Sequence, residues 1–493
     1  MPTVLELEPD WIAQLRSALW AAGYRADRVG EVLGAQPEHM QPDPAQAVLL
    51  DRGLAAGSTL STLIRLFILG LGAREDEVAA ALAPLTVDHA RRLGILEPAA
   101  GGALQGAIRI TPFREFLFAC SRVPDLFAVE RDHVMGVTRS SINLANLTLR
   151  RPVELTLDLG CGCGFQSLLA SRHSTRVIAT DINPLALKFA EFNARLNAVG
   201  NIELREGSYL EPVAGESFDL VVSNPPFVIS PDQRFLYRDS GRRGDELSRE
   251  IVREVAGVLR PGGTATVMVS WGRAAGEWDA SPRSWVAGNG CDAWILHQAT
   301  QPALAHAASW HQHLTQRDLD AYAAGVRRWT EYVSNLGFEG VAYGAVILRR
   351  REGPNWVRSE DLPEADAPPA AEQLLRMTAA QDMLFRLPDR AALLDQKPRL
   401  VPGHRLDQTL RCVNGTYVIE AAMLQLTDGL RFRAAVDAFN AFLITRLDGA
   451  RTLRQAVAES VEAAPQPGLG LADVEAAVLR SVRRMLELGF LEI

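Results

Sequence analysis

The chain has 493 residues, of which 47% are hydrophobic and 22% charged, and its formal net charge is −8. This is the composition of an ordinary globular protein of about two to four domains, and no long segment is of low complexity. The negative net charge argues against a broadly basic nucleic-acid-binding surface, although it leaves room for a local basic patch.

The cysteines and the apolar runs indicate the cellular compartment of the protein. The five cysteines are Cys120, Cys161, Cys163, Cys291 and Cys412. Their scattered spacing suits a reducing compartment better than a disulfide framework. The N-terminus carries acidic residues early and lacks the apolar core of a signal peptide. The longest apolar run, residues 61–73, is interrupted by Arg65. We therefore expect a cytoplasmic protein without a membrane span.

Residues 1–128 are predicted to form a mainly helical N-terminal domain. Predicted helices span residues 11–23, 61–70, 74–82 and 86–96, and a strand-like alternation follows over 103–113. The first helix repeats apolar residues at helical spacing and ends at Gly23. Three helices followed by a strand pair is the order of a winged-helix module, which small packing domains share.

Residues 129–353 are predicted to form an α/β domain. Apolar strands are expected over residues 154–160, 176–182, 202–208, 218–224, 264–271, 293–298 and 342–350. Helical patterns over 184–200 and 246–259 lie between strands, which indicates a mostly parallel sheet covered on both faces. A long helix over 318–337, between the last two strands, is expected to act as a cover.

The C-terminal part is predicted to be a separate domain after a linker. Residues 354–373 are rich in proline and acidic residues, which is typical of a linker. Residues 374–493 contain a strand pair over 409–426 with Asn414 and Gly415 as its turn, followed by helices over 432–447, 452–460 and 472–489. We expect an α+β domain, again resembling a winged helix.

The segment LDLGCGCG, residues 157–164, follows a predicted strand and precedes a helix. Glycines at this point let backbone N–H groups approach a ligand at the helix N-terminus. Asp181 ends the next strand, about 20 residues further on, where a carboxylate can bind a ribose diol. The pattern predicts a nucleotide-type cofactor site.

The compact Asp-x-Gly-x-Gly-x-Gly form resembles motif I of the class I S-adenosylmethionine (SAM)-dependent methyltransferases. The resemblance implies a seven-stranded Rossmann-like sheet and SAM as cofactor, with Asp181 at the ribose and Ser208 near the adenine in place of the more usual Asp. The cofactor-binding residues implied are Asp158, Gly160, Gly162, Gly164, Asp181, Ile182, Ser208 and Asn224. Gly136 and Thr138 are expected to lie in a segment that closes over SAM.

Other interpretations of these residues remain open. A nucleotide-binding or redox Rossmann domain is one, although the third glycine of the dinucleotide pattern GxGxxG is missing from the helix. Cys161 and Cys163 could suggest a metal, but they sit in a turn that needs small residues and have no further ligands at suitable spacing. The histidines of segment 306–313 could suggest another metal, but a polar loop is the simpler prediction. No metal is expected.

The segment SNPPF, residues 223–227, leaves the fourth strand at the carboxyl edge of the sheet. An –NH2 group conjugated to a carbonyl or an aromatic ring is a poor nucleophile. Two acceptors that take its two N–H bonds, the Asn224 side-chain carbonyl and the Pro225 backbone carbonyl, would localise its lone pair. Two prolines would hold these acceptors rigidly, and Phe227 offers a face for stacking. A stiff connector is the alternative.

The Asn-Pro-Pro-Phe segment resembles the amino-group methyltransferases that act on adenine, on guanine in ribosomal RNA and on the release-factor glutamine. Residues 237–247 resemble only loosely the Gly-Gly-x-Asp-Gly-Leu segment of the glutamine enzymes, because Arg243 and Glu246 replace two glycines. Arg242 and Arg243 could bind phosphate or an acidic protein, or begin a solvated helix.

Three functions therefore stay open. We expect a SAM-dependent N-methyltransferase acting on a macromolecule, with a nucleobase amine of RNA or DNA slightly favoured. A protein glutamine is the first alternative, and a non-catalytic SAM-sensing protein that binds nucleic acid is the second. The sequence does not indicate the oligomeric state.

Overall fold

The computed structural model describes residues 5–40, 44–122, 129–464, 468 and 470–493. The chain forms two compact units, one of Met1–Ala145 with Arg150–Glu360 and the other of Asn146–Leu149 with Asp361–Ile493. None of the helices in the described part of the chain combines the length and apolar composition that crossing a bilayer requires.

The N-terminal part of the first unit is mainly helical, as expected. Its helices are α1 Pro9–Ala21, α2 Ala26–Leu33, α3 Pro44–Asp51, α4 Thr59–Ile64, α5 Glu75–Leu82 and α6 Val87–Arg92, with the short turns η1 Pro37–His39, η2 Arg65–Leu69 and η3 Ala100–Gly102. Its strands are β1 Leu96–Pro98, β2 Leu104–Gly106, β3 Ile108–Phe113 and β4 Phe116–Ser121, and they pair antiparallel as β1–β2 and β3–β4. The winged-helix interpretation of this region stays a prediction.

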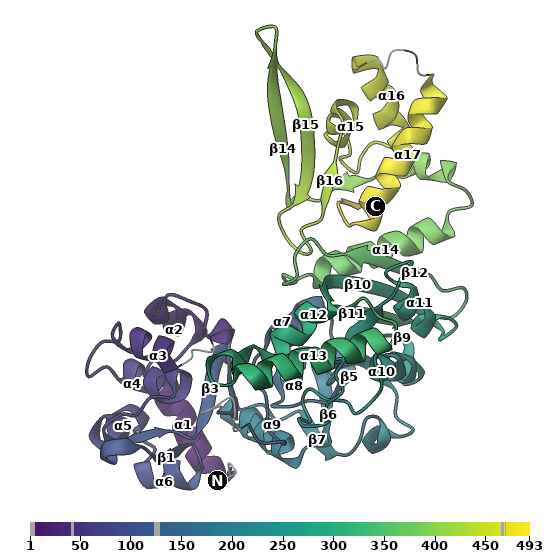
Figure 1. The fold of residues 1–493 in the computed structure, drawn as a ribbon. Coiled ribbons are helices and arrows are strands. Elements are labelled where there is room, and N and C mark those ends of the chain that lie inside the picture. Colours follow the sequence, from purple (N-terminus) through teal and green to yellow (C-terminus); the bar gives the residue numbers. More distant parts are fainter. Residues whose placement is uncertain (1–4, 41–43, 123–128, 465–467, 469) are drawn as a thin grey trace. The chain divides into compact units, whose positions relative to one another are not determined.

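A single sheet dominates the rest of the first unit (Figure 1). Its strands are β5 Val153–Leu159, β6 Ser174–Asp181, β7 Ile202–Glu206, β8 Phe218–Ser223, β9 Leu259–Arg273, β10 Cys291–Pro302, β11 Gly340–Arg350 and β12 Val357–Asp361. Their order across the sheet is β12-β10-β11-β9-β8-β5-β6-β7. The strands β7, β6, β5, β8 and β9 run parallel, whereas β11 is antiparallel to both β9 and β10. The predicted α/β class is confirmed.

The strand count differs from the expected seven. The eighth strand, β12, lies within residues 354–373, which the sequence analysis predicts to be a linker. The backbone N–H of Ala293 in β10 donates to the carbonyl of Trp356 at 2.9 Å, and the two tryptophans Trp294 and Trp356 pack edge to face. The buried Trp356 therefore fastens this segment to the sheet despite its polar, proline-rich surroundings.

The helices that accompany the sheet pack into two different hydrophobic cores. They are α7 Arg139–Leu147, α8 Phe165–Ala170, α9 Pro184–Leu196, α10 Glu246–Gly257, α11 Ala280–Val286, α12 Ala303–His311 and α13 Leu319–Asn335, with η4 Glu211–Val213 and η5 Gln312–Gln316. Helices α10 and α11 share one core with the central strands. Helices α8 and α9 share another with the N-terminal helices.

Asn193 of α9 and Asn197, the residue that caps its C-terminus, fasten the helix to the neighbouring hairpin. The side-chain amide of Asn193 accepts from the N–H of Ala119 at 2.7 Å and donates to its carbonyl at 2.8 Å. Asn197 makes the same pair of bonds to Leu117, each at 2.8 Å. Spacing of four residues places both amides on one face of the helix, where they satisfy backbone groups of β4. The boundary expected at residue 129 thus falls within a single compact unit.

The second unit is an α+β structure. It contains α14 Ala371–Arg386, η6 Ala391–Asp395, β13 Arg399–Leu400, β14 His404–Val413, β15 Thr416–Leu426, β16 Arg433–Ala435, α15 Ala438–Ile444, α16 Leu453–Ala463, α17 Leu471–Glu487 and β17 Leu491–Glu492. Figure 1 shows β14 and β15 as a long two-stranded ribbon. Asn414 and Gly415 both have positive φ, as the predicted hairpin turn requires.

One predicted helix of this unit is shorter than expected. The helix predicted over 432–447 begins only at Ala438, because Asp437 caps it by accepting the N–H of Asn440 at 2.6 Å. The residues before the cap form β16, which pairs with β15.

Candidate functional site

The glycine loop has the conformation that only glycine adopts easily. Gly160, Gly162 and Gly164 have φ values of 74°, 53° and 78°. The backbone N–H groups of Gly160 and Cys161 both donate to the carbonyl of Thr180 at 2.9 Å, which holds the loop over the end of β6. A Cβ on Gly164 would lie 3.1 Å from the Cβ of Ala190, so this glycine also allows α8 and α9 to approach closely.

Asp181 lies directly beside this loop at the end of β6. One carboxylate oxygen accepts the N–H of Gly162 at 2.8 Å and the other accepts the N–H of Asn183 at 2.8 Å. Burial raises the pKa of Asp181 above its ordinary value, and these N–H groups oppose the shift. The carboxylate has further lone pairs available for a ligand.

Asp158 lies beneath the loop and is almost completely buried. Its carboxylate accepts a hydrogen bond from Ser167 at 2.5 Å. Burial raises the pKa of Asp158 to about 7, against the opposing effect of Ser167. Ser167, on α8, is a partner that the sequence analysis missed.

Two further predicted residues lie at the same edge. Ile182 follows Asp181 and is 58% exposed, which is unusual for an isoleucine beside a buried strand. Ser208 follows β7, and the N–H of the preceding Gly207 donates to the carbonyl of Asp181 at 3.1 Å. Because β5, β6 and β7 are adjacent and parallel, the predicted cofactor residues gather at one edge of the sheet.

The Asn-Pro-Pro-Phe segment leaves β8 beside the glycine loop. The Asn224 side-chain N–H group donates to the hydroxyl of Ser140 at 3.1 Å, and its oxygen Oδ1 is buried without a hydrogen-bond partner. A buried acceptor without a partner costs about 1–3 kcal/mol, so it is a place where a ligand donor is expected. This oxygen is one of the two acceptors that the sequence predicts.

The second predicted acceptor, the backbone carbonyl of Pro225, already accepts one hydrogen bond. The carbonyl of Pro225 accepts the N–H of Phe227 at 2.7 Å, which closes a tight turn. A carbonyl oxygen has two lone pairs, so one remains for a ligand. The ring of Phe227 packs edge to face against that of Tyr343, with the ring centroids 6.4 Å apart. The backbone carbonyl of Phe227 accepts a hydrogen bond from the hydroxyl of Ser270.

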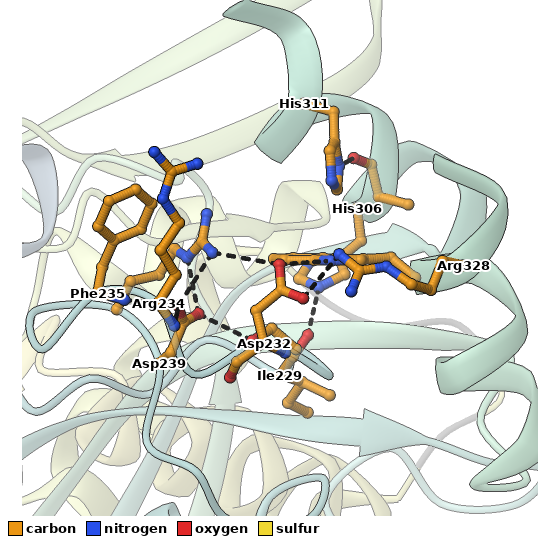
Figure 2. A network of polar contacts seen from close by, with 12 residues as sticks. Ile229, Asp232, Arg234, Phe235, Asp239, His306, His311 and Arg328 are labelled. Carbon is orange, nitrogen blue, oxygen red and sulfur yellow. Dashed lines mark hydrogen bonds and ion pairs between the residues drawn. The ribbon is translucent and has the colours of Figure 1, made fainter. Parts of the chain in front are cut away.

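The loop that follows Phe227 is held by a buried ion pair (Figure 2). Arg238 donates to Asp239 at 2.7 and 3.0 Å, and the same carboxylate accepts from Ser230 and from the backbone N–H groups of Arg234 and Phe235. Burial favours a higher pKa for Asp239, but Arg238 and the N–H of Phe235 outweigh it, so the pKa lies below its ordinary value. The ion pair fixes the course of residues 230–239.

Helix α13 is fastened to this loop, which supports its predicted role as a cover. Arg328 pairs with Asp232 at 2.7 Å, and the indole N–H of Trp329 donates to Asp232 at 3.1 Å. Trp329 is fully buried, and the guanidinium of Arg238 lies over its ring at 5.2 Å. The cover and the loop therefore form one packed layer next to Phe227.

The histidine segment is not the polar loop that the sequence predicts. His306 and His311 lie in helix α12 and are buried. One ring nitrogen of His306 bonds the carbonyl of Ile229 at 2.8 Å and the other the hydroxyl of Tyr343 at 2.5 Å. Burial lowers the pKa of His306 to about 4. No group of three metal-ligating side chains occurs among the described residues.

The segment before β5 contains the predicted residues Gly136 and Thr138 and one further residue, Ser140, that sequence reasoning missed. Gly136 packs closely, since a Cβ there would lie 2.5 Å from the sulfur of Cys120. The hydroxyl of Thr138 lies 3.1 Å from that of Ser140, which in turn bonds Asn224. Serine and threonine are common, and Ser140 is 84 residues from its partner, so no local signal could have found this contact.

The arginines Arg242 and Arg243 stay at the surface. Arg242 pairs with Glu250 at 3.2 Å, with both side chains well exposed. The backbone N–H of Arg243 donates to the carboxylate of Glu246 at 3.1 Å at the start of α10. Both the binding and the solvated-helix interpretations stay open.

Comparison with known proteins assigns this site to a class. Residues 140–271 match the family model described as "Methyltransferase small domain", and residues 21–106 match a domain of unknown function. A release factor glutamine methyltransferase from Xylella fastidiosa is 33% identical over 130 residues, which are 24% of this chain and 47% of that protein. One from Aliivibrio fischeri is 42% identical over 126 residues, 25% of this chain and 43% of that protein.

An archaeal relative has a similar name. A putative protein N5-glutamine methyltransferase from Methanocaldococcus jannaschii is 34% identical over 122 residues, 23% of this chain and 60% of that protein. The solved structure of a putative sarcosine dimethylglycine methyltransferase from Galdieria sulphuraria is 20% identical, covers 43% of this chain and 86% of that chain, and has a TM-score of 0.29.

The matched segment of this chain is therefore a class I SAM-dependent methyltransferase domain, similar to the release-factor glutamine methyltransferases. The prediction of the methyltransferase class and of SAM as cofactor is confirmed. The chain spans about half the length of the curated relatives it matches, and the methyltransferase family model matches residues 140–271.

Proposed function

We propose that this protein transfers a methyl group from SAM to the side-chain amide nitrogen of a glutamine in a protein substrate. The observation that carries the proposal is the buried, unpartnered Oδ1 of Asn224 at the carboxyl edge of β8. It supplies an acceptor for an N–H group next to the glycine loop. The names of the relatives favour glutamine over the nucleobase amine that the sequence slightly favours.

The residues of the site fit the chemistry of an amide. The nitrogen of a primary amide is weakly nucleophilic because its lone pair is delocalised into the carbonyl. Asn224 Oδ1 and the carbonyl of Pro225 would accept its two N–H bonds and draw it toward a tetrahedral geometry. These acceptors are preorganised, since Asn224 is held by Ser140 and Pro225 by its turn with Phe227.

SAM, when bound, supplies an electrophilic methyl group whose bond to sulfur breaks as the bond to nitrogen forms. The methylated nitrogen passes its extra proton to water after transfer, so no strong base is needed beside it. Phe227 would stack on the plane of the amide, and its edge-to-face contact with Tyr343 keeps its ring in place. His306 stays neutral near pH 7 and serves to hold Tyr343.

The cofactor residues are assigned by the same fit. Gly160, Gly162 and Gly164 would shape the pocket of the methionine part, above the buried Asp158. Asp181 would accept the ribose hydroxyls with the lone pairs that its backbone donors leave free. The adenine would lie near Ser208 and against the exposed Ile182.

The test is transfer of labelled methyl from SAM to purified bacterial release factor and, separately, to total RNA and to DNA. We expect label in the release factor, removed by protease and recovered after hydrolysis as N5-methylglutamine. Label in RNA or DNA without label in the protein would overturn the glutamine proposal and support the nucleobase alternative. Binding of SAM without transfer to any of the three would favour the non-catalytic alternative.

A further inference from the structure

Three hydroxyl groups form a chain that ends on the catalytic asparagine. Asn224 bonds Ser140 at 3.1 Å, and Ser140 bonds Thr138 at 3.1 Å. The hydroxyl of Thr138 donates to that of Ser141 at 3.1 Å, and the hydroxyl of Ser141 donates to the backbone carbonyl of Thr138 at 2.8 Å. The chain lies at the start of α7, before β5.

The proton of each hydroxyl in this chain can be assigned. A backbone carbonyl only accepts, so the single proton of Ser141 is committed to the carbonyl of Thr138. Ser141 therefore accepts the proton of the Thr138 hydroxyl. Because the proton of Thr138 is directed to Ser141, Ser140 is the donor in the contact between Ser140 and Thr138. The hydroxyl of Ser140 therefore has only lone pairs left for the N–H group of Asn224.

This direction matters because the two ends of an amide side chain differ. A group that can only accept binds the –NH2 end of Asn224, which leaves Oδ1 on the opposite side, buried and without a partner. Reversal of the amide would place an oxygen against the lone pairs of Ser140 and an N–H group against the N–H group of the methyl acceptor. Two donors facing each other in a buried site repel.

We propose that Ser140, with Thr138 and Ser141 behind it, is a positioning residue that selects the orientation of the Asn224 amide and so keeps its oxygen toward the methyl acceptor. This inference rests on the proposed function, because it assumes that Asn224 accepts the N–H group of a substrate amide. Ser140 itself touches no reacting atom.

The first test compares kcat for methylation of purified bacterial release factor among variants of the full chain. Ser140→Ala removes the acceptor, and we expect kcat to fall about 10- to 100-fold while the Kd for SAM changes less than twofold. Ser140→Thr keeps the hydroxyl and should restore most of the rate. Thr138→Val leaves Ser140 free to turn its proton toward Asn224 and should give an intermediate loss.

A matched control is Ser171→Ala, which removes a hydroxyl that donates to the carbonyl of Leu168 at the end of α8. It should leave kcat unchanged. A Ser140→Ala variant with kcat within twofold of the wild type would overturn the inference. So would a loss of SAM affinity as large as the loss of kcat, since that would indicate a merely structural role.

A second measurement needs no methyl acceptor, so it separates failure of this inference from failure of the proposed function. The protein is labelled with ¹⁵N-asparagine, and the side-chain NH2 signals of Asn224 are assigned by their loss in Asn224→Ala. We expect slow hydrogen exchange of one Asn224 side-chain proton in the wild type and in Ser140→Thr, and at least tenfold faster exchange in Ser140→Ala. Equal exchange in all three would overturn the inference even if release factor proved not to be the substrate.

Discussion

The hydroxyl of Ser223 donates to the backbone carbonyl of Leu159 at 2.9 Å. Leu159 is the last residue of β5 and precedes the glycine loop, while Ser223 is the last residue of β8 and precedes Asn224. One buried hydrogen bond thus joins the strand ends from which the glycine loop and the Asn-Pro-Pro-Phe segment leave the sheet.

Removal of this hydrogen bond should make the position of the Asn-Pro-Pro-Phe segment relative to the glycine loop less fixed. Ser223→Ala deletes a fully buried donor, and we expect the free energy of unfolding to fall by about 1 kcal/mol and kcat to fall several-fold. Urea denaturation and steady-state kinetics measure the two effects. The control is Ser284→Ala, which removes an exposed hydroxyl that donates to the carbonyl of Ser281. Equal effects of the two substitutions would refute the role of Ser223.

The pKa of Asp158 predicts how stability depends on pH. Because burial raises this pKa to about 7, the folded protein holds a proton that the unfolded chain releases at lower pH. Between about pH 4 and pH 7 the folded state binds more protons, so stability falls as pH rises through this window. Asp158→Asn cannot ionise, and we expect its urea midpoint to fall less than that of the wild type between pH 5 and pH 8. Parallel pH curves for the two proteins would contradict the raised pKa.

The buried pair Arg238–Asp239 should contribute far more to stability than the exposed pair Arg242–Glu250, which joins the end of this loop region to α10. The Asp239 side chain has no exposed surface and that of Arg238 is 8% exposed. Asp239→Ala would remove the nearer carboxylate of the guanidinium buried among Phe235 and Trp329 and leave it the more distant Asp232 at 3.5 Å, at a cost of about 3 kcal/mol. Thermal denaturation measures the loss.

The matched control for that pair is Glu250→Ala. Arg242 and Glu250 are exposed by 49% and 37%, so their pair should contribute less than about 1 kcal/mol. A similar loss of stability from both substitutions would show that the loop after Phe227 is not held as described.

The local patterns of the central domain were predictable from the sequence. Apolar runs predicted each of the strands β5 to β11. The closely spaced glycines predicted the loop before α8, and in the structure these glycines have positive φ. These features depend on residues close together in the chain. Strand β12 was missed because one buried residue, Trp356, holds a segment whose composition is that of a linker.

The contacts that complete the site were beyond sequence reasoning. Ser140 meets Asn224 across 84 residues, and His306 meets Ile229 across 77. A single serine or histidine has no pattern that reveals a partner in another element. The prediction of a polar loop around His306 was wrong because this segment forms helix α12, in which Ala307 and Trp310 pack against Trp329.

We propose that the Asn224 oxygen grips the methyl acceptor, and that Asn224, although it is also among the implied cofactor-binding residues, contributes little to SAM binding. The most direct test of this central claim measures kcat for release-factor methylation and the Kd for SAM in Asn224→Ala and in Asp181→Ala. The account predicts that Asn224→Ala loses kcat by about 100-fold or more with SAM affinity nearly intact, and that Asp181→Ala chiefly weakens SAM binding. An Asn224→Ala variant that loses SAM affinity in proportion to kcat, or that keeps its kcat, would contradict it.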